Sequence, residues 1–270
     1  MMKTAVTLCR VPESAAGPFV FHGPLPESFA KAAAIGFDAV ELFLEGPDAV
    51  PAEEIHALQQ QYGLAVAAVG TGSGMVKHGL SLTDASPEKR KAALDFLLRM
   101  IGFGGRLGSP AILGSMQGRW SAEVPREKAL DLLAASLRIA GEAAGACGVP
   151  FIYEPLNRYE TNLFNRFVAA AEFLDQREIS NVVLLADLFH MNIEERDVAD
   201  SLRAAAHRLG HVHWADSNRQ AMGFGHTDAA SVMGVLREIS YSGYLSAEVF
   251  PLPDADAAAR QTLQSLIDLR

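Results

Sequence analysis

The chain has 270 residues, of which 49% are hydrophobic and 20% charged, and its formal net charge is −9. This composition excludes a mainly disordered chain, which would carry fewer apolar residues and more charge. The acidic balance argues against a general binder of nucleic acid or of anionic membranes. With no apolar run of about 18 residues for a membrane span and no signal-peptide pattern, we expect a cytoplasmic protein.

Short apolar runs alternate along the chain with segments of helical spacing. The runs lie at residues 4–9, 39–43, 64–69, 110–113, 150–153, 182–186, 211–214 and 244–249. Because most are continuously apolar, they predict parallel strands that are buried on both faces. The helical segments include 51–62, 87–106, 125–147 and 256–269, with Ser86 and Pro87 as a helix start and with Gly36, Gly63 and Gly243 as helix ends.

Eight strand and helix units in this length predict a single (β/α)8 TIM barrel that spans residues 1–270. An open, doubly wound sheet is the alternative. The glycine-rich segment 70–74 follows the third strand, but it lacks the last glycine of a dinucleotide fingerprint and no clear helix follows it. The barrel is therefore the preferred prediction.

Four polar side chains stand at the ends of four consecutive predicted strands. They are Glu154, Asp187, His213 and Glu248, separated by 33, 26 and 35 residues, which is about one βα unit each. Active sites of TIM barrels lie at the carboxyl ends of the strands, so we expect these four side chains at one rim. Three converging carboxylates would repel one another unless a cation neutralised them.

The donor set predicts one bound divalent metal ion. Carboxylate oxygens suit Mn2+ and Mg2+, and the imidazole also admits Co2+ or Zn2+, with Mn2+ preferred. His211 lies two residues before His213 on the same strand, and we expect it in the core or behind the ligands rather than on the metal.

Three long segments carry a resemblance to a known family. Residues 153–161, 187–195 and 211–219 resemble the sugar isomerase/epimerase superfamily, which has the xylose isomerase-like TIM barrel. The chain is most similar to the ketose 3-epimerases and, closer still, to the 5-keto-L-gluconate epimerases. Residues 70–72 and 79–83 also resemble that last type.

The resemblance implies a function and roles for seven residues. Glu154, Asp187, His213 and Glu248 match the metal ligands, and Glu154 and Glu248 also match the two acid/base carboxylates, set on opposed strands. Glu160, His190 and Arg219 match residues that bind the substrate. The implied reaction removes a proton beside a carbonyl and returns one to the opposite face, through an enediolate that the metal stabilises.

The resemblance also bears on partners. It implies a small-molecule sugar or sugar acid as substrate, no nucleic-acid or membrane partner, and a homo-oligomer, either a dimer or a tetramer. The loop 217–225 departs from the plain ketose 3-epimerases. This departure makes a keto-sugar acid a possible substrate, with Arg219 or Lys77 available for its carboxylate.

Several alternatives stay open at this point. An aldose–ketose isomerase acting on a sugar or sugar phosphate and a hydroxypyruvate isomerase would use a similar metal barrel. An inosose dehydratase, an endonuclease IV-like nuclease and a non-catalytic sugar-binding module are less favoured. The nuclease would need further metal-binding histidines, and the remaining ones (His22, His56, His78, His207 and His226) form no obvious cluster in the sequence.

Overall fold

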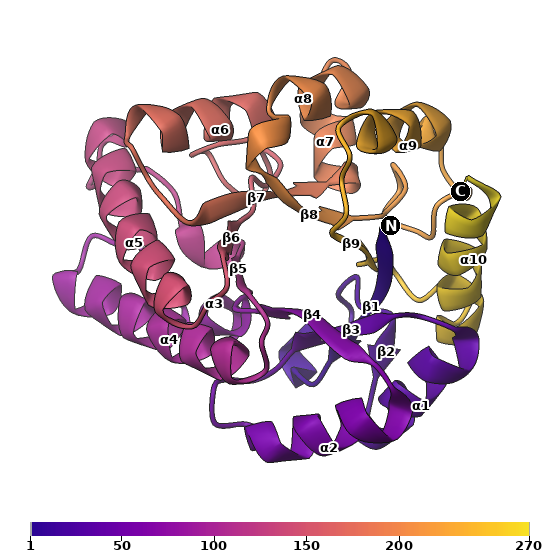
Figure 1. Ribbon diagram of the computed structural model, residues 1–270. Coiled ribbons are helices and arrows are strands. Elements are labelled where there is room, and N and C mark those ends of the chain that lie inside the picture. The colour runs from indigo at the N-terminus through magenta and orange to yellow at the C-terminus, as the bar shows by residue number, and fades with distance from the viewer. Residues whose placement is uncertain (1, 270) are drawn as a thin grey trace.

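The computed structural model describes residues 2–269 as a closed parallel barrel inside a ring of helices (Figure 1). The barrel strands are β1 (Lys3–Cys9), β3 (Ala39–Phe43), β4 (Ala65–Gly70), β5 (Ala111–Leu113), β6 (Phe151–Tyr153), β7 (Val182–Asp187), β8 (Leu209–His213) and β9 (Tyr244–Ala247). They follow one another in chain order, and the pairing of β1 with β9 closes the barrel. The predicted TIM barrel is confirmed, and the open sheet is excluded.

A short extra strand, β2 (Phe21–His22), extends the sheet at the carboxyl end of β1. Residues 3–6 of β1 pair with β9, whereas Leu8 and Cys9 pair with β2. Thr7 joins the two regions, since its hydroxyl donates to the Ala247 carbonyl oxygen at 2.8 Å and accepts from the Val20 amide at 3.0 Å. This strand was not predicted, because a segment of two residues is too short to show a pattern in the sequence.

Helices cover the outside of the barrel. The long ones are α1 (Leu25–Ile35), α2 (Ala52–Tyr62), α4 (Pro87–Arg106), α5 (Arg126–Ala146), α6 (Phe167–Gln176), α9 (Ala229–Glu238) and α10 (Ala255–Asp268). Short helices lie in the loops: α3 (Ser73–His78), α7 (Leu188–Glu194), α8 (Val198–Ala204) and three 3-10 turns at Pro12–Ser14, Ser115–Gln117 and Ala206–Arg208. Among residues 2–269, no helix is both long enough and apolar enough to cross a membrane.

Local signals set most of the helix boundaries. The Ser86 hydroxyl accepts from the Lys89 amide at the start of α4, and Gly36 and Gly63 take left-handed conformations at the ends of α1 and α2, as predicted. The prediction for Gly243 is wrong, because α9 ends earlier and Ser240 takes the left-handed conformation. Gly243 instead leaves room for the Tyr241 ring, whose hydroxyl would lie 2.4 Å from a Cβ at that position.

The glycine-rich segment 70–74 also differs from the expectation, since α3 begins within it at Ser73. Its glycines permit close packing. A Cβ at Gly70 would lie 2.7 Å from the Phe43 ring, and one at Gly74 would lie 2.3 Å from the Met116 sulfur. These glycines therefore let the loop after β4 pack tightly beside the carboxyl ends of the strands.

Candidate active site

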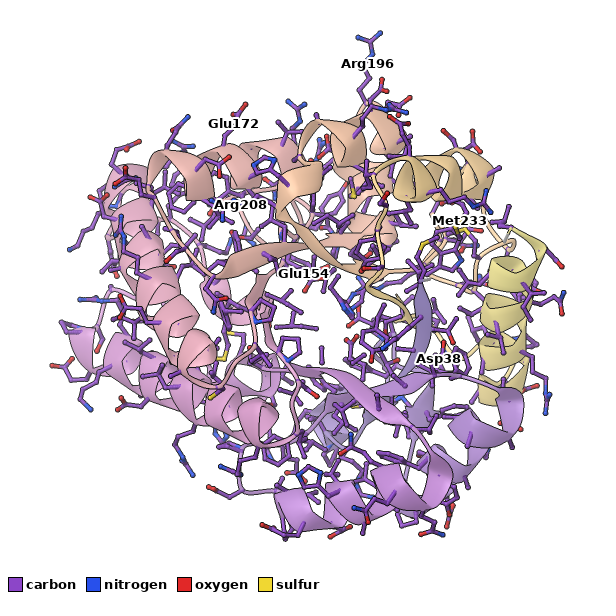
Figure 2. The ribbon with its side chains drawn as sticks, viewed as in Figure 1. Asp38, Glu154, Glu172, Arg196, Arg208 and Met233 are labelled. Atoms are coloured by element: carbon purple, nitrogen blue, oxygen red, sulfur yellow. The ribbon has the colours of Figure 1, made fainter. Side chains whose placement is uncertain are left out.

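The four side chains predicted to bind metal meet at the carboxyl ends of β6 to β9. Each of Glu154, Asp187, His213 and Glu248 offers one ligand atom, and these atoms all lie within 4.8 Å of one another. The first three are buried and Glu248 is partly buried. Figure 2 shows Glu154 inside the ring of strands, whereas Glu172 on α6 and Arg196 between α7 and α8 project outward from the molecule. The barrel thus brings together residues that are up to 94 positions apart.

His213 faces the carboxylates with one ring nitrogen. Its Nδ1 lies 3.2 Å from Asp187 Oδ2, 3.4 Å from Glu248 Oε2 and 3.7 Å from Glu154 Oε1. Its other nitrogen, Nε2, points away from this cluster and lies 3.1 Å from Glu41 Oε1. The imidazole therefore offers Nδ1 to the carboxylate cluster and Nε2 to a different partner.

Electrostatics in the cluster favour a cation. Burial raises the pKa of Glu154 well above its usual range, and the nearby charges of Glu248 and Asp187 raise it further. Burial lowers the pKa of His213, but the charges of Glu248 and Glu41 outweigh burial and raise it. A buried carboxyl such as Glu154, whose ionised form is disfavoured by neighbouring carboxylates, marks a place where a divalent ion is favourable. Three oxygen donors and one imidazole fit such an ion.

Arg219 adds a positive charge beside the cluster. Its guanidinium pairs with Glu248, lies 3.4 Å from Asp187 Oδ2 and sits 4.7 Å from the centre of the Phe189 ring. It also lies 3.8 Å from Glu160 Oε1. The backbone of Arg219 is left-handed, with φ of 60°, a conformation that is unfavourable for a residue other than glycine. Such a conformation is typical of functional sites, where surrounding contacts enforce it.

A hydrogen-bond network fixes the orientation of His190. Asn157 Nδ2 lies 3.0 Å from Glu160 Oε1 and 2.7 Å from His190 Nδ1. Because a carboxylate only accepts, the Asn157 amide must present its NH2 group, and His190 Nδ1 must accept. Burial lowers the pKa of His190 and favours the neutral ring. His190 Nε2 then carries the proton. This nitrogen lies 3.8 Å from Glu154 Oε1 and 3.8 Å from Asp187 Oδ2.

The loop that carries Arg219 is organised by Asp216. This buried carboxylate accepts from the backbone amides of Ser217 and Thr227 through Oδ1, and from those of Gly223 and Gly225 through Oδ2, at 2.7 to 2.9 Å. Its own carbonyl accepts from the Arg219 amide at 2.8 Å. One side chain therefore holds both ends of the loop after β8.

A cavity of about 590 Å³ opens at the cluster. Glu154, His213, Glu248, His190, Glu160 and Arg219 line its inner part, and Phe19, Phe43, Val76 and Phe250 line much of the rest. Lys77, which was expected to be available for a substrate carboxylate, pairs with Glu45 instead. The described residues that line the cavity include no lysine, and the lining guanidinium of Arg219 already contacts three carboxylates.

Two buried residues of the site escaped the sequence analysis. Glu41 lies inside the barrel on β3, and Asn157 lies in the loop after β6. The signal for Glu41 was a lone carboxylate within an otherwise apolar strand, which is rare unless the charge is paired. Asn157 was visible only as part of a polar loop. His211, expected in the core or behind the ligands, is buried, and its Nε2 lies 2.8 Å from Glu41 Oε2.

TIM-barrel enzymes hold their active sites at the carboxyl ends of the barrel strands, and the carboxylate-rich cavity of this chain lies there. The sequence model of the family described as xylose isomerase-like TIM barrel matches residues 29–269, and the chain belongs to this family.

The most similar relatives include several sugar epimerases. An L-ribulose 3-epimerase of Methylomonas sp. is 32% identical over 88% of this chain and 82% of its own. A 3-dehydro-D-guloside 4-epimerase of Escherichia coli is 29% identical over 81% of this chain and 84% of its own. The crystal structure of a D-allulose 3-epimerase from Methylomonas sp. in complex with D-allulose superposes with a TM-score of 0.81, at 25% identity, over 99% of this chain and 98% of that one.

These names bear out the predicted resemblance to the ketose 3-epimerases, and epimerases are isomerases, the class of enzyme that was predicted. The closer similarity to 5-keto-L-gluconate epimerases stays a prediction, as do the cytoplasmic location and the homo-oligomer.

Proposed function

We propose that this protein is a divalent-metal-dependent epimerase of neutral keto-sugars, of the ketose 3-epimerase type. The observation that carries the proposal is the convergence of Glu154 and Glu248 with Asp187 and His213. Their four candidate ligand atoms all lie within 4.8 Å of one another. The names of the relatives support the reaction class, since the L-ribulose and D-psicose enzymes are 3-epimerases. Glu154, Asp187, His213 and Glu248 would hold the metal.

Glu154 and Glu248 are proposed as the acid/base pair. One carboxylate removes the proton from the carbon beside the carbonyl, and the other delivers a proton to the opposite face. The two residues exchange roles in the reverse direction. We expected these two residues on opposed strands. They instead follow β6 and β9, which are separated by β7 and β8 and are therefore not diametrically opposed. When bound, a divalent cation would supply Lewis acidity for the carbonyl and hydroxyl oxygens of the substrate.

His190, Arg219 and Glu160 are proposed to orient the sugar. The His190 Nε2–H group is fixed by Asn157 and is available to donate to a sugar oxygen in the cavity. The Arg219 guanidinium supplies further donors, and the Glu160 carboxylate can accept from hydroxyl groups. Together they offer both donors and acceptors, which suits a polyhydroxylated ligand.

The charge of the cavity favours a neutral sugar over a sugar acid or a phosphate. Among the described residues that line it, Glu13, Glu41, Glu154, Glu160 and Glu248 are acidic, and Arg219 is the basic one apart from histidines. A bound divalent ion and Arg219 together would offset the metal-binding carboxylates. An anionic group elsewhere in the cavity would still face Glu13 and Glu160 without a cationic partner. The keto-sugar acid is therefore the less favoured substrate.

Product analysis tests this proposal. The protein with Mn2+ is incubated with L-ribulose, D-psicose and D-fructose, and with a 5-keto sugar acid, and the products are identified by chromatography. We expect a C3 epimer from at least one neutral ketose and a much lower kcat/KM for the acid. An aldose product would support the alternative of an aldose–ketose isomerase. Preference for the acid would refute the charge argument.

A further inference from the structure

Glu41 joins two histidines inside the barrel. Glu41 is 5% exposed, and its two carboxylate oxygens face different rings: Oε2 lies 2.8 Å from His211 Nε2, and Oε1 lies 3.1 Å from His213 Nε2. The three residues come from β3 and β8, which lie three strands apart around the closed barrel. They also form a second group of candidate metal ligands. The contacts of 2.8 and 3.1 Å are hydrogen-bond distances.

Hydrogen-bond chemistry fixes where the protons of this group lie. A carboxylate accepts and does not donate, so each histidine must present an Nε2–H group to Glu41. In a neutral imidazole with its proton on Nε2, the lone pair is on Nδ1. For His213, Nδ1 faces Asp187, Glu248 and Glu154 at 3.2 to 3.7 Å, so Nδ1 is the nitrogen that would give its lone pair to a cation bound among these carboxylates.

We infer that Glu41 is a positioning residue that holds His213 in the tautomer and ring orientation needed for metal binding through Nδ1. This inference rests on the proposed function, since it concerns the same metal site. His211 fixes the orientation of Glu41. Its Nε2–H group donates to Oε2, and this contact keeps Oε1 directed at His213. A carboxylate behind a metal-binding histidine orients the ring and raises its basicity, and its loss costs about 10- to 100-fold in metal affinity.

The direct test compares Mn2+ binding by calorimetry in the wild type, Glu41→Gln and Glu45→Gln. Glu45 follows β3 and pairs with Lys77 outside the cluster, so its variant is a matched control. We expect Glu41→Gln to raise the Mn2+ Kd about 10- to 100-fold and Glu45→Gln to leave it unchanged. Equal Kd values for a folded Glu41→Gln and the wild type would overturn the inference. Failure of the wild type to bind Mn2+ would instead contradict the proposed function.

A second measurement needs no variant at Glu41. Nitrogen NMR of 15N-histidine-labelled wild type, saturated with diamagnetic Mg2+, locates the ring proton of His213. We expect this proton on Nε2. A proton on Nδ1 would overturn the inference even if Glu41→Gln does not fold.

Discussion

Replacing Asp216 by Asn should destabilise the protein and loosen the loop that carries Arg219. Each Asp216 oxygen accepts two backbone N–H groups, from Ser217 and Thr227 or from Gly223 and Gly225. An amide has one acceptor oxygen, so Asp216→Asn leaves two donors facing an NH2 group. With about 1.5–3 kcal/mol for each hydrogen bond to a charged acceptor, the loss is about 3–6 kcal/mol if the loop does not relax.

Urea denaturation at pH 7 measures this loss. Asp228→Asn is the matched control, because Asp228 caps α9 through one amide, that of Ser231, and Asn caps helices about as well. We expect Asp228→Asn to change the free energy of unfolding by less than about 0.5 kcal/mol. If Asp216→Asn is no more destabilising than this control, the reasoning about its four hydrogen bonds is refuted.

The pH dependence gives an independent check on Asp216. Its four amide donors outweigh burial, which acts in the opposite direction, and lower the pKa of Asp216 to about 2. A carboxyl pKa that is lower in the folded state contributes stability above the unfolded pKa of about 4, and this contribution is lost as the pH falls toward 2. The stability difference between wild type and Asp216→Asn should therefore narrow by about 1 kcal/mol between pH 7 and pH 3. A constant difference would contradict this account.

Three further predictions concern the site itself. Glu248→Gln should lower kcat about 10²- to 10⁴-fold, measured by product formation with saturating Mn2+, because an acid/base group is lost; retained epimerisation would contradict its role. Asn157→Leu should raise KM for a ketose, since His190 loses its fixed tautomer, and unchanged steady-state kinetics would argue against this. Mn2+ at 100 times its Kd should raise the free energy of unfolding by about 2.7 kcal/mol, and EDTA should reverse the gain in thermal melts; no shift would argue against a resident metal.

The barrel could be predicted because its evidence is repeated along the chain. Most of the barrel strands are continuous apolar runs, and several of the long helices have a boundary signal of their own, such as Ser86 before α4 or Gly63 after α2. Errors occurred where one residue had two interpretations. Gly243 was taken as a helix end, although the packing of the Tyr241 ring accounts for it.

The candidate metal site could be predicted for a related reason. Parallel barrel strands all present their carboxyl ends at one rim, so Glu154, Asp187, His213 and Glu248 could be placed together by their order alone. The role of Glu41 could not be predicted in this way. Its partners are 170 and 172 residues away, and no feature of its own strand indicates which residues they are. The same limit applied to Lys77, whose pairing with Glu45 depends on how the loops after β3 and β4 pack.

Proton NMR in D2O shows directly whether the protein epimerises a ketose by proton transfer. The wild-type protein with Mn2+ is incubated with the ketose that it converts best, and deuterium is followed at the carbon beside the carbonyl. We expect the epimer to form with deuterium at that carbon, because Glu154 and Glu248 exchange their protons with solvent. An epimer that forms without solvent deuterium, or a ketose panel that remains unchanged, would contradict epimerisation by proton transfer at this site.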